Sequence, residues 1–285
     1  MFRFGVDSFI WSEVFSEKDV WIIPKAKELG FEVVDLAVAH PDTFPLDKVL
    51  QAKRETGLEL VTTTTLGPAT NLISPDVEVR ANGVRHMKTL VDINVALGSK
   101  ILGGVNYAGW GCLTKKPRTD AEWEWSVRAM REIAGYAKDN WDGIIAVECV
   151  NRFETHFLNI AADAVQYCKD VGVDNMRVHL DCFHMIREEK SFSGAVHECG
   201  KDYLGYVHVN ENDRGIPGTG LVPFAEFFAA LKEVGYDGPL TIESFDPSFE
   251  ELNGMCAIWR KFAESGEALA VEGLKHLKAV AADIG

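Results

Sequence analysis

Residues 176–182 read MRVHLDC, a short and largely apolar run that includes Asp181 near its end. Runs of the same kind lie on either side of it along the chain: IIAVECV at 144–150, YLGYVHVN at 203–210 and PLTIESF at 239–245. Each run is followed by a longer stretch with helical periodicity. This alternation is expected of parallel strands that are joined by crossover helices. The second half of the chain therefore predicts four strand-and-helix units.

Four earlier runs extend the pattern toward the N-terminus: FRFGVDSFI at 2–10, FEVVDLAV at 31–38, LELVTTTT at 58–65 and KILGGVN at 100–106. Eight such units in 285 residues favour a closed barrel over a doubly wound open sheet. The GxGxxG and GxxxxGK[ST] motifs typical of open sheets are also missing from the sequence. We predict an α/β fold, a single (β/α)8 TIM barrel that forms one domain over 1–285. An additional C-terminal helix is expected at 266–280.

Local signals predict where some of the helices begin and end. Ser74 and Pro75 have the character of an N-cap and a first-turn proline, and Gly98 lies where that helix should stop. Thr119 and Glu122 have the spacing of a capping box, in which each residue satisfies a backbone N–H of the other. These signals predict two long helices in the first half of the chain.

The charge of the chain argues against anionic partners. Lys and Arg number 29 against 43 Asp and Glu, which gives a formal net charge of −14. Such a surface repels nucleic acid and anionic lipid headgroups. The start of the sequence has no secretion signal, and no apolar run approaches the roughly 20 residues that span a bilayer. Six cysteines without a CxxC pair suit reduced thiols, so we predict a cytoplasmic protein that binds neither nucleic acid nor a membrane.

Polar residues stand at the ends of the last four predicted strands, and these are Glu148, Asp181, His208 and Glu243. They are spaced 33, 27 and 35 residues apart, one strand-and-helix unit each time. In a barrel of this type the carboxyl ends of the strands build the active site. A single acid at a strand end is usually a loop cap or a surface charge. Four on successive strands instead predict one central site.

Three carboxylates and one imidazole around a point require a cation, because like charges at close range oppose one another's ionisation. Oxygen-rich ligation with one nitrogen suits a single divalent ion of the Mn²⁺, Co²⁺ or Mg²⁺ type better than a structural zinc, which prefers thiolates. We expect Mn²⁺, with Co²⁺ and Mg²⁺ as alternatives. Six other histidines are interpreted as structural or surface residues: His179, which lies deeper in its strand, and His40, His86, His156, His197 and His276.

Long stretches of the chain resemble the ketose 3-epimerases, that is, the D-tagatose/D-psicose (D-allulose) 3-epimerases and L-ribulose 3-epimerase of the xylose-isomerase-like TIM barrel superfamily. The resemblance covers nearly the whole chain. It is densest in EVVDLAV at 32–38, VECVNRFETHFLN at 147–159, HLDCFHMIREE at 179–189, HVNENDRGIPGTG at 208–220 and GYDGPLTIESF at 235–245.

The resemblance implies metal-dependent epimerisation at C3 of free ketoses of the D-psicose/D-fructose, D-tagatose or L-ribulose type, by deprotonation and reprotonation through a cis-enediolate. Glu148 and Glu243 match the acid/base pair, and together with Asp181 and His208 they match the metal ligands. The residues that match the substrate contacts are Glu154, His184, Arg214 and Trp110, with Phe9 and Trp11 as further candidates. A homodimer or homotetramer is also implied.

Other activities occur on the same scaffold, because a fold does not fix its chemistry. The alternatives are an aldose-ketose isomerase, hydroxypyruvate isomerase or inosose dehydratase, and a sugar-binding protein without catalysis. An abasic-site endonuclease needs a histidine-rich zinc cluster and a basic face, neither of which the sequence offers. The strand-six loop reads HMIREE at 184–189 where the family has HMNIEE, and this departure leaves the preferred sugar open.

Overall fold

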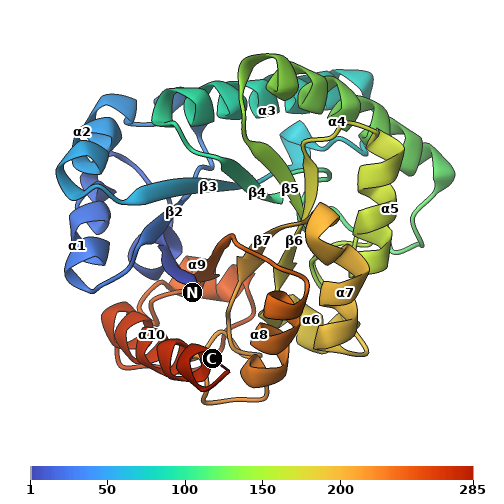
Figure 1. Ribbon diagram of the computed structural model, residues 1–285. Coiled ribbons are helices and arrows are strands. Elements are labelled where there is room, and N and C mark those ends of the chain that lie inside the picture. Colours follow the sequence, from blue (N-terminus) through green and yellow to red (C-terminus); the bar gives the residue numbers. More distant parts are fainter. Residues whose placement is uncertain (1, 285) are drawn as a thin grey trace.

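The computed structural model describes residues 2–284, and eight parallel strands in it close into a barrel (Figure 1). The strands are β1 (Arg3–Asp7), β2 (Val33–Ala37), β3 (Glu59–Thr65), β4 (Ile101–Val105), β5 (Ile144–Glu148), β6 (Met176–Asp181), β7 (Leu204–His208) and β8 (Pro239–Ile242). Each lies within a run that the sequence predicted. The barrel closes where β1 pairs with β8, with Phe4 opposite Leu240. The (β/α)8 barrel prediction is confirmed.

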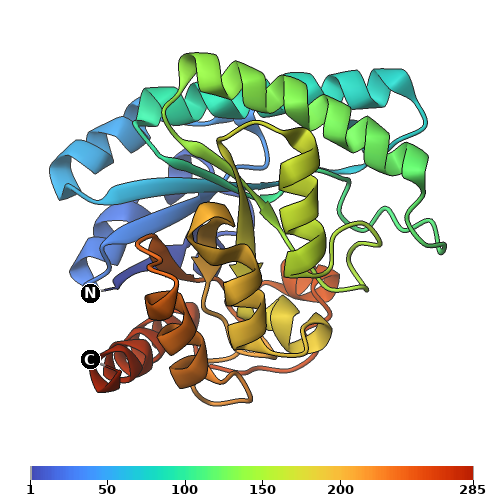
Figure 2. The ribbon, with the colours of Figure 1, turned by 45° about the vertical axis from the view of Figure 1, so that its right-hand side comes forward.

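Most of the helices surround the barrel on its outside (Figures 1 and 2). They are α1 (Ile22–Glu28), α2 (Leu46–Thr56), α3 (Val77–Leu97), α4 (Asp120–Asn140), α5 (Ala161–Val171), α6 (Cys182–Glu188), α7 (Phe192–Tyr203), α8 (Phe224–Glu233), α9 (Glu250–Met255) and α10 (Gly266–Asp283). Short 3-10 helices lie at Ser8–Ile10, Glu17–Asp19, Pro41–Thr43 and Pro68–Thr70. The predicted C-terminal helix is α10, which packs against α8 and β8.

Strand alternation divides the core into two layers. One layer lies between barrel and helices, and it buries the strand residues Val147, Leu180, Val207 and Ile242. A small separate cluster fills the inside of the barrel, and it consists of Val33, Val61, Ile101, Ala146 and Tyr206. The side chains at the strand ends therefore lie above a closely packed barrel interior, which limits their movement.

The helix signals are confirmed in two places and wrong in one. Thr119 and Glu122 form the capping box of α4, and Gly98 ends α3 in the left-handed conformation at φ 60°. The N-cap of α3, however, is Asp76 and not Ser74, because the Asp76 carboxylate accepts a hydrogen bond from the Glu78 N–H at 2.9 Å. Pro75 therefore precedes the helix.

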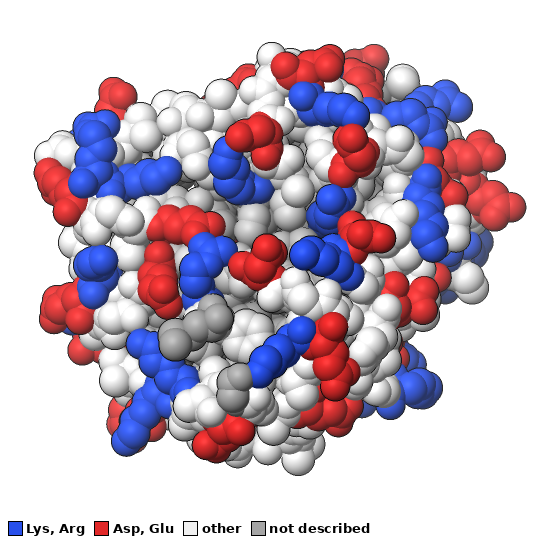
Figure 3. All heavy atoms as spheres, viewed as in Figure 1, with Lys and Arg blue, Asp and Glu red and all other residues white. Residues whose placement is uncertain are grey.

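Lys and Arg are interspersed with Asp and Glu over the face shown in Figure 3. The six cysteines are free thiols, as predicted. Among the helices of residues 2–284, none combines the length and the apolar character needed to cross a membrane.

Candidate active site

The four polar strand ends converge at the carboxyl end of the barrel. Glu148, Asp181 and His208 are the last residues of β5, β6 and β7, and Glu243 directly follows β8. Each offers a ligand atom, and these atoms all lie within 4.8 Å of one another. Three of the four side chains are buried, and that of Glu243 is 13% exposed. The structure thus brings together the four residues that the sequence singled out.

The orientation of His208 suits a cation. Its Nε2 lies 3.1 Å from Oδ2 of Asp35, and because that carboxylate accepts, Nε2 carries the proton. Nδ1 faces Oδ2 of Asp181 at 3.5 Å and Oε2 of Glu243 at 3.3 Å, and it has no hydrogen-bond partner among residues 2–284. A buried imidazole nitrogen aimed at carboxylates has the geometry of a metal ligand whose other nitrogen is held by an acid.

Asn210 supports two of these groups from the loop after β7. Its Nδ2 donates to Oδ2 of Asp181 at 2.6 Å, and its Oδ1 accepts from the Glu243 N–H at 2.6 Å. One amide therefore ties the end of β6 to the residue after β8. We did not predict this role from the sequence, where Asn210 is simply the second residue after His208.

The surroundings shift the pKa values of Glu148 and Glu243 in opposite directions. Burial, followed by the charges on Glu243 and Asp181, raises the pKa of Glu148 well above its usual value. Burial alone would also raise the pKa of Glu243, but Arg214 and His208 outweigh it and hold that pKa well below the usual value. Two carboxyl groups with opposed shifts are typical of an acid and a base that work together.

Arg214 contacts the carboxylates directly. One guanidinium nitrogen donates to Oε2 of Glu243 at 2.6 Å and to Oδ2 of Asp181 at 3.1 Å, and the guanidinium carbon lies 4.2 Å from the centre of the Phe183 ring. Its backbone is strained at φ 63°, and the Ser244 hydroxyl donates to its carbonyl at 2.5 Å. A strained residue held by several contacts is typical of functional sites.

The other predicted substrate contacts form a connected group beside the four strand ends. Trp110 Nε1 donates to Oε2 of Glu154 at 2.7 Å, and Asn151 Nδ2 donates to its Oε1 at 2.8 Å. The Asn151 N–H also donates to Nδ1 of His184 at 3.1 Å, and Nε2 of His184 lies 3.6 Å from Oε1 of Glu148. Asn151 had no role in the sequence analysis, and the structure shows that it orients both Glu154 and His184.

His179 was interpreted as a structural residue. It is fully buried on the interior face of β6, and neither ring nitrogen has a hydrogen-bond partner within residues 2–284. Burial, and then the nearby His208, lower its pKa well below the usual value, so the ring is neutral. Its Nδ1 lies 3.8 Å from Oε2 of Glu148. It therefore lies directly beneath the site.

A cavity of about 140 Å³ opens beside Glu148, Glu243 and the predicted substrate contacts. Its polar lining consists of Thr65, Trp110, Glu148, Glu154, His184, Arg214 and Glu243. Its remaining lining consists of Phe9, Val105, Val150, Phe183, Phe245, Leu252, Met255 and Cys256. The last three come from α9 and the residue after it, which the sequence did not predict to lie over the site.

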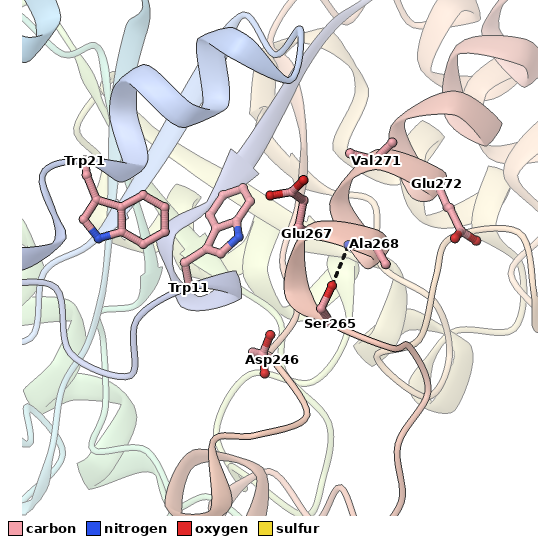
Figure 4. A pocket seen from close by; sticks show the side chains of 8 residues that line it. All are labelled: Trp11, Trp21, Asp246, Ser265, Glu267, Ala268, Val271 and Glu272. Carbon is pink, nitrogen blue, oxygen red and sulfur yellow. Dashed lines mark hydrogen bonds between the residues drawn. The ribbon is translucent and has the colours of Figure 1, made fainter.

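A larger hollow of about 560 Å³ lies outside the barrel mouth (Figure 4). Trp11 and Trp21 stand on one side of it and the start of α10 on the other. Glu267 in this hollow pairs with Lys25 at 3.0 Å, and Asp246 accepts the Gly266 N–H at 2.5 Å. Trp11, a candidate for the sugar site, therefore lines a different surface, where these two acidic groups are already partnered.

Comparison with known proteins agrees with the fold. Residues 23–280 match the family model described as xylose isomerase-like TIM barrel. L-ribulose 3-epimerase of Mesorhizobium japonicum is 34% identical over 98% of this chain and 93% of that protein. D-psicose 3-epimerase of Agrobacterium fabrum is 32% identical over 90% of each. The crystal structure of D-allulose 3-epimerase from Methylomonas sp. in complex with D-allulose is 32% identical, with a TM-score of 0.92 over 98% of this chain and 96% of that one.

Proposed function

The chain belongs to the xylose isomerase-like TIM barrel family and is a carbohydrate epimerase of the ketose 3-epimerase group, and on this premise we propose that it inverts C3 of free ketoses with the help of one divalent metal ion. The observation that carries the proposal is the convergence of ligand atoms of Glu148, Asp181, His208 and Glu243, which all lie within 4.8 Å of one another. The proposed substrates are D-psicose, D-fructose, D-tagatose and L-ribulose.

Glu148, Asp181, His208 and Glu243 would hold the ion. Three oxygen-donor groups and one nitrogen fit Mn²⁺ first, and Co²⁺ or Mg²⁺ as alternatives. When bound, the metal supplies Lewis-acid stabilisation of the negative charge that develops on the substrate oxygens beside C3.

Glu148 and Glu243 act as the base and the acid at C3. Inversion at C3 requires that one carboxylate removes the proton from one face and that the other returns a proton from the opposite face. Both groups line the cavity beside the proposed metal site, so both can reach a bound substrate. Loss of the C3 proton leaves a cis-enediolate, whose charge must be held until reprotonation.

Four further side chains bind and orient the sugar in this proposal. Glu154 and His184 hydrogen-bond the ketone end, in the orientations that Asn151 imposes on them. Arg214 offers its planar set of donors to the sugar hydroxyls. The Trp110 ring flanks the substrate, while its Nε1 holds Glu154.

Reaction in deuterated water tests the proposed chemistry. The Mn²⁺-loaded protein is incubated with a panel of ketopentoses and ketohexoses, and the products are analysed by NMR. We expect C3-epimeric ketoses that carry solvent deuterium at C3, because a carboxyl proton exchanges with solvent before it is returned. An aldose product that retains the original hydrogen would instead identify a hydride-shift aldose-ketose isomerase on the same barrel.

A further inference from the structure

A buried carboxylate lies beneath the four strand ends and has no part in the proposed mechanism. Asp35, in the middle of β2, is 0% exposed. Burial of a carboxylate is costly unless donors satisfy its oxygens. Thr63 Oγ1 donates to Oδ1 at 3.0 Å, Tyr206 OH donates to Oδ2 at 2.7 Å, and Nε2 of His208 lies 3.1 Å from Oδ2. Three polar groups in the barrel interior therefore satisfy the buried Asp35 carboxylate.

Hydrogen bonds from neighbouring strands fix the orientation of the Asp35 carboxylate. Thr63 on β3 and Tyr206 on β7 approach its two oxygens from different strands, and the Tyr206 hydroxyl also lies 2.8 Å from Oγ1 of Thr241 on β8. The neighbouring side chains are buried, so the carboxylate has little room to rotate. Asp35 thus presents one lone pair of Oδ2 to the His208 ring.

We propose that Asp35 is a positioning residue that fixes the proton of His208 on Nε2 and so keeps Nδ1 free to bind the metal. The inference rests on the metal site of the proposed function and extends it to a residue outside that site. An ionised carboxylate only accepts hydrogen bonds, so Nε2 must donate. A neutral imidazole with its proton on Nε2 has its lone pair on Nδ1, the atom that faces Asp181 and Glu243.

A second cation site is the competing interpretation, because Asp7, Asp35 and His208 also offer ligand atoms within 4.8 Å of one another. The hydrogen bonds favour the positioning role. Thr63 and Tyr206 direct hydroxyl hydrogens at the Asp35 oxygens, and a cation there would face those hydrogens and the Nε2 proton.

The test replaces Asp35 by asparagine, which keeps the shape of the side chain. An asparagine keeps its oxygen toward the Tyr206 hydroxyl and Nε2 of His208 and turns its amide nitrogen toward the Thr63 hydroxyl, which can accept. A neutral amide oxygen then holds the Nε2 proton less strongly than the carboxylate does. We expect the dissociation constant for Mn²⁺, measured from the EPR signal of the free ion, to rise about 10- to 100-fold. The melting temperature of the metal-free protein should change little, which separates a changed ligand from a damaged fold.

Two further variants complete the design. Asp7→Asn is the matched control, because Asp7 lies opposite Asp35 in the register of β1 and β2 and has no hydrogen bond to His208. It should bind Mn²⁺ as tightly as wild type. Tyr206→Phe removes one donor to Asp35 and leaves His208 in place, so it should weaken Mn²⁺ binding by less than Asp35→Asn. It also keeps the inference testable if Asp35→Asn fails to fold.

NMR of the Zn²⁺-loaded protein with labelled histidine reads the position of the proton directly. Wild type should show the His208 proton on Nε2 with the downfield shift of a hydrogen bond to a carboxylate, and Asp35→Asn should reduce that shift. The inference is overturned if Asp35→Asn binds Mn²⁺ as tightly as wild type, if Asp7→Asn weakens binding equally, or if wild type binds two ions and Asp7→Asn one. Failure of wild type to bind Mn²⁺ would overturn the metal site itself, so the two failures are distinguishable.

Discussion

Glu148 and Glu243 carry the proton transfer in the proposed mechanism, and an isosteric amide at either position removes the transferable proton. We expect Glu148→Gln and Glu243→Gln each to lower kcat/KM for the best ketose by about 100-fold or more, the usual contribution of an acid or base. The loss should persist at saturating Mn²⁺, because added metal restores occupancy but not the carboxyl group. Steady-state kinetics at increasing Mn²⁺ measures this.

Glu198→Gln on the exposed side of α7 is the matched control and should leave kcat/KM unchanged. Near wild-type turnover in Glu148→Gln or Glu243→Gln would contradict the assignment of the acid/base pair.

The residues of the site differ in how far the sequence could reveal them. Glu148, Asp181, His208 and Glu243 were found because strand ends in a parallel barrel lie at one edge, so spacing along the chain predicts proximity. Asp35 was missed as a site residue because its contact with His208 spans 173 residues of sequence and crosses the barrel interior. Such a contact follows from the closure of the barrel and the exact register of the strands, which no local pattern contains.

At the scale of elements, strands were predictable and the covering segment was not. Each strand is a local apolar run between helical stretches, and its bounds need no knowledge of the rest of the fold. The segment after β8 depends on distant partners instead. The Asp246 carboxylate accepts the Gly266 N–H at 2.5 Å, and Asn253 Nδ2 donates to the Asp246 carbonyl at 2.9 Å. These contacts place α9 over the cavity.

The start of α4 offers a prediction for a single element. Glu122 accepts from the Thr119 N–H at 2.7 Å, and Thr119 Oγ1 accepts from the Glu122 N–H at 3.2 Å. Thr119→Ala removes one half of this capping box and should lower the free energy of unfolding by about 1 kcal/mol. Urea denaturation of the metal-free protein measures the change.

Acid should abolish the contribution of Glu122. Burial would raise its pKa, but the Thr119 hydrogen bonds and His156 outweigh burial and lower it. A carboxyl group whose pKa is lowered by folding stabilises the protein above its usual pKa, and this stabilisation is lost as the pH falls through the lowered value. Glu122→Gln should therefore destabilise the protein near neutral pH and differ less from wild type in acid. Glu124→Gln, exposed on the same helix, should show neither effect.

At the scale of the whole molecule, the predicted homodimer or homotetramer stays a prediction. Met255 and Trp259 are 57% and 79% exposed on the segment that covers the cavity. They are large apolar side chains beside the barrel mouth, of the kind that subunit interfaces bury. An interface there would link assembly to the segment that lines the site.

The metal should also stabilise the fold as a whole. Burial and the charges of Glu243 and Asp181 oppose the ionisation of Glu148 when no metal ion is bound, and a divalent cation offsets this cost. An ion that binds only the folded state adds about 2.7 kcal/mol at a concentration 100 times its dissociation constant. Chelation should therefore lower the melting temperature by roughly 5–10 °C, and Mn²⁺ should restore it in a concentration-dependent way. Glu243→Gln should show a smaller Mn²⁺-dependent shift because it offers the ion one charge less. Equal melting temperatures in chelator and in excess Mn²⁺, Co²⁺ and Mg²⁺ would mean that the four residues do not bind these ions in the folded protein.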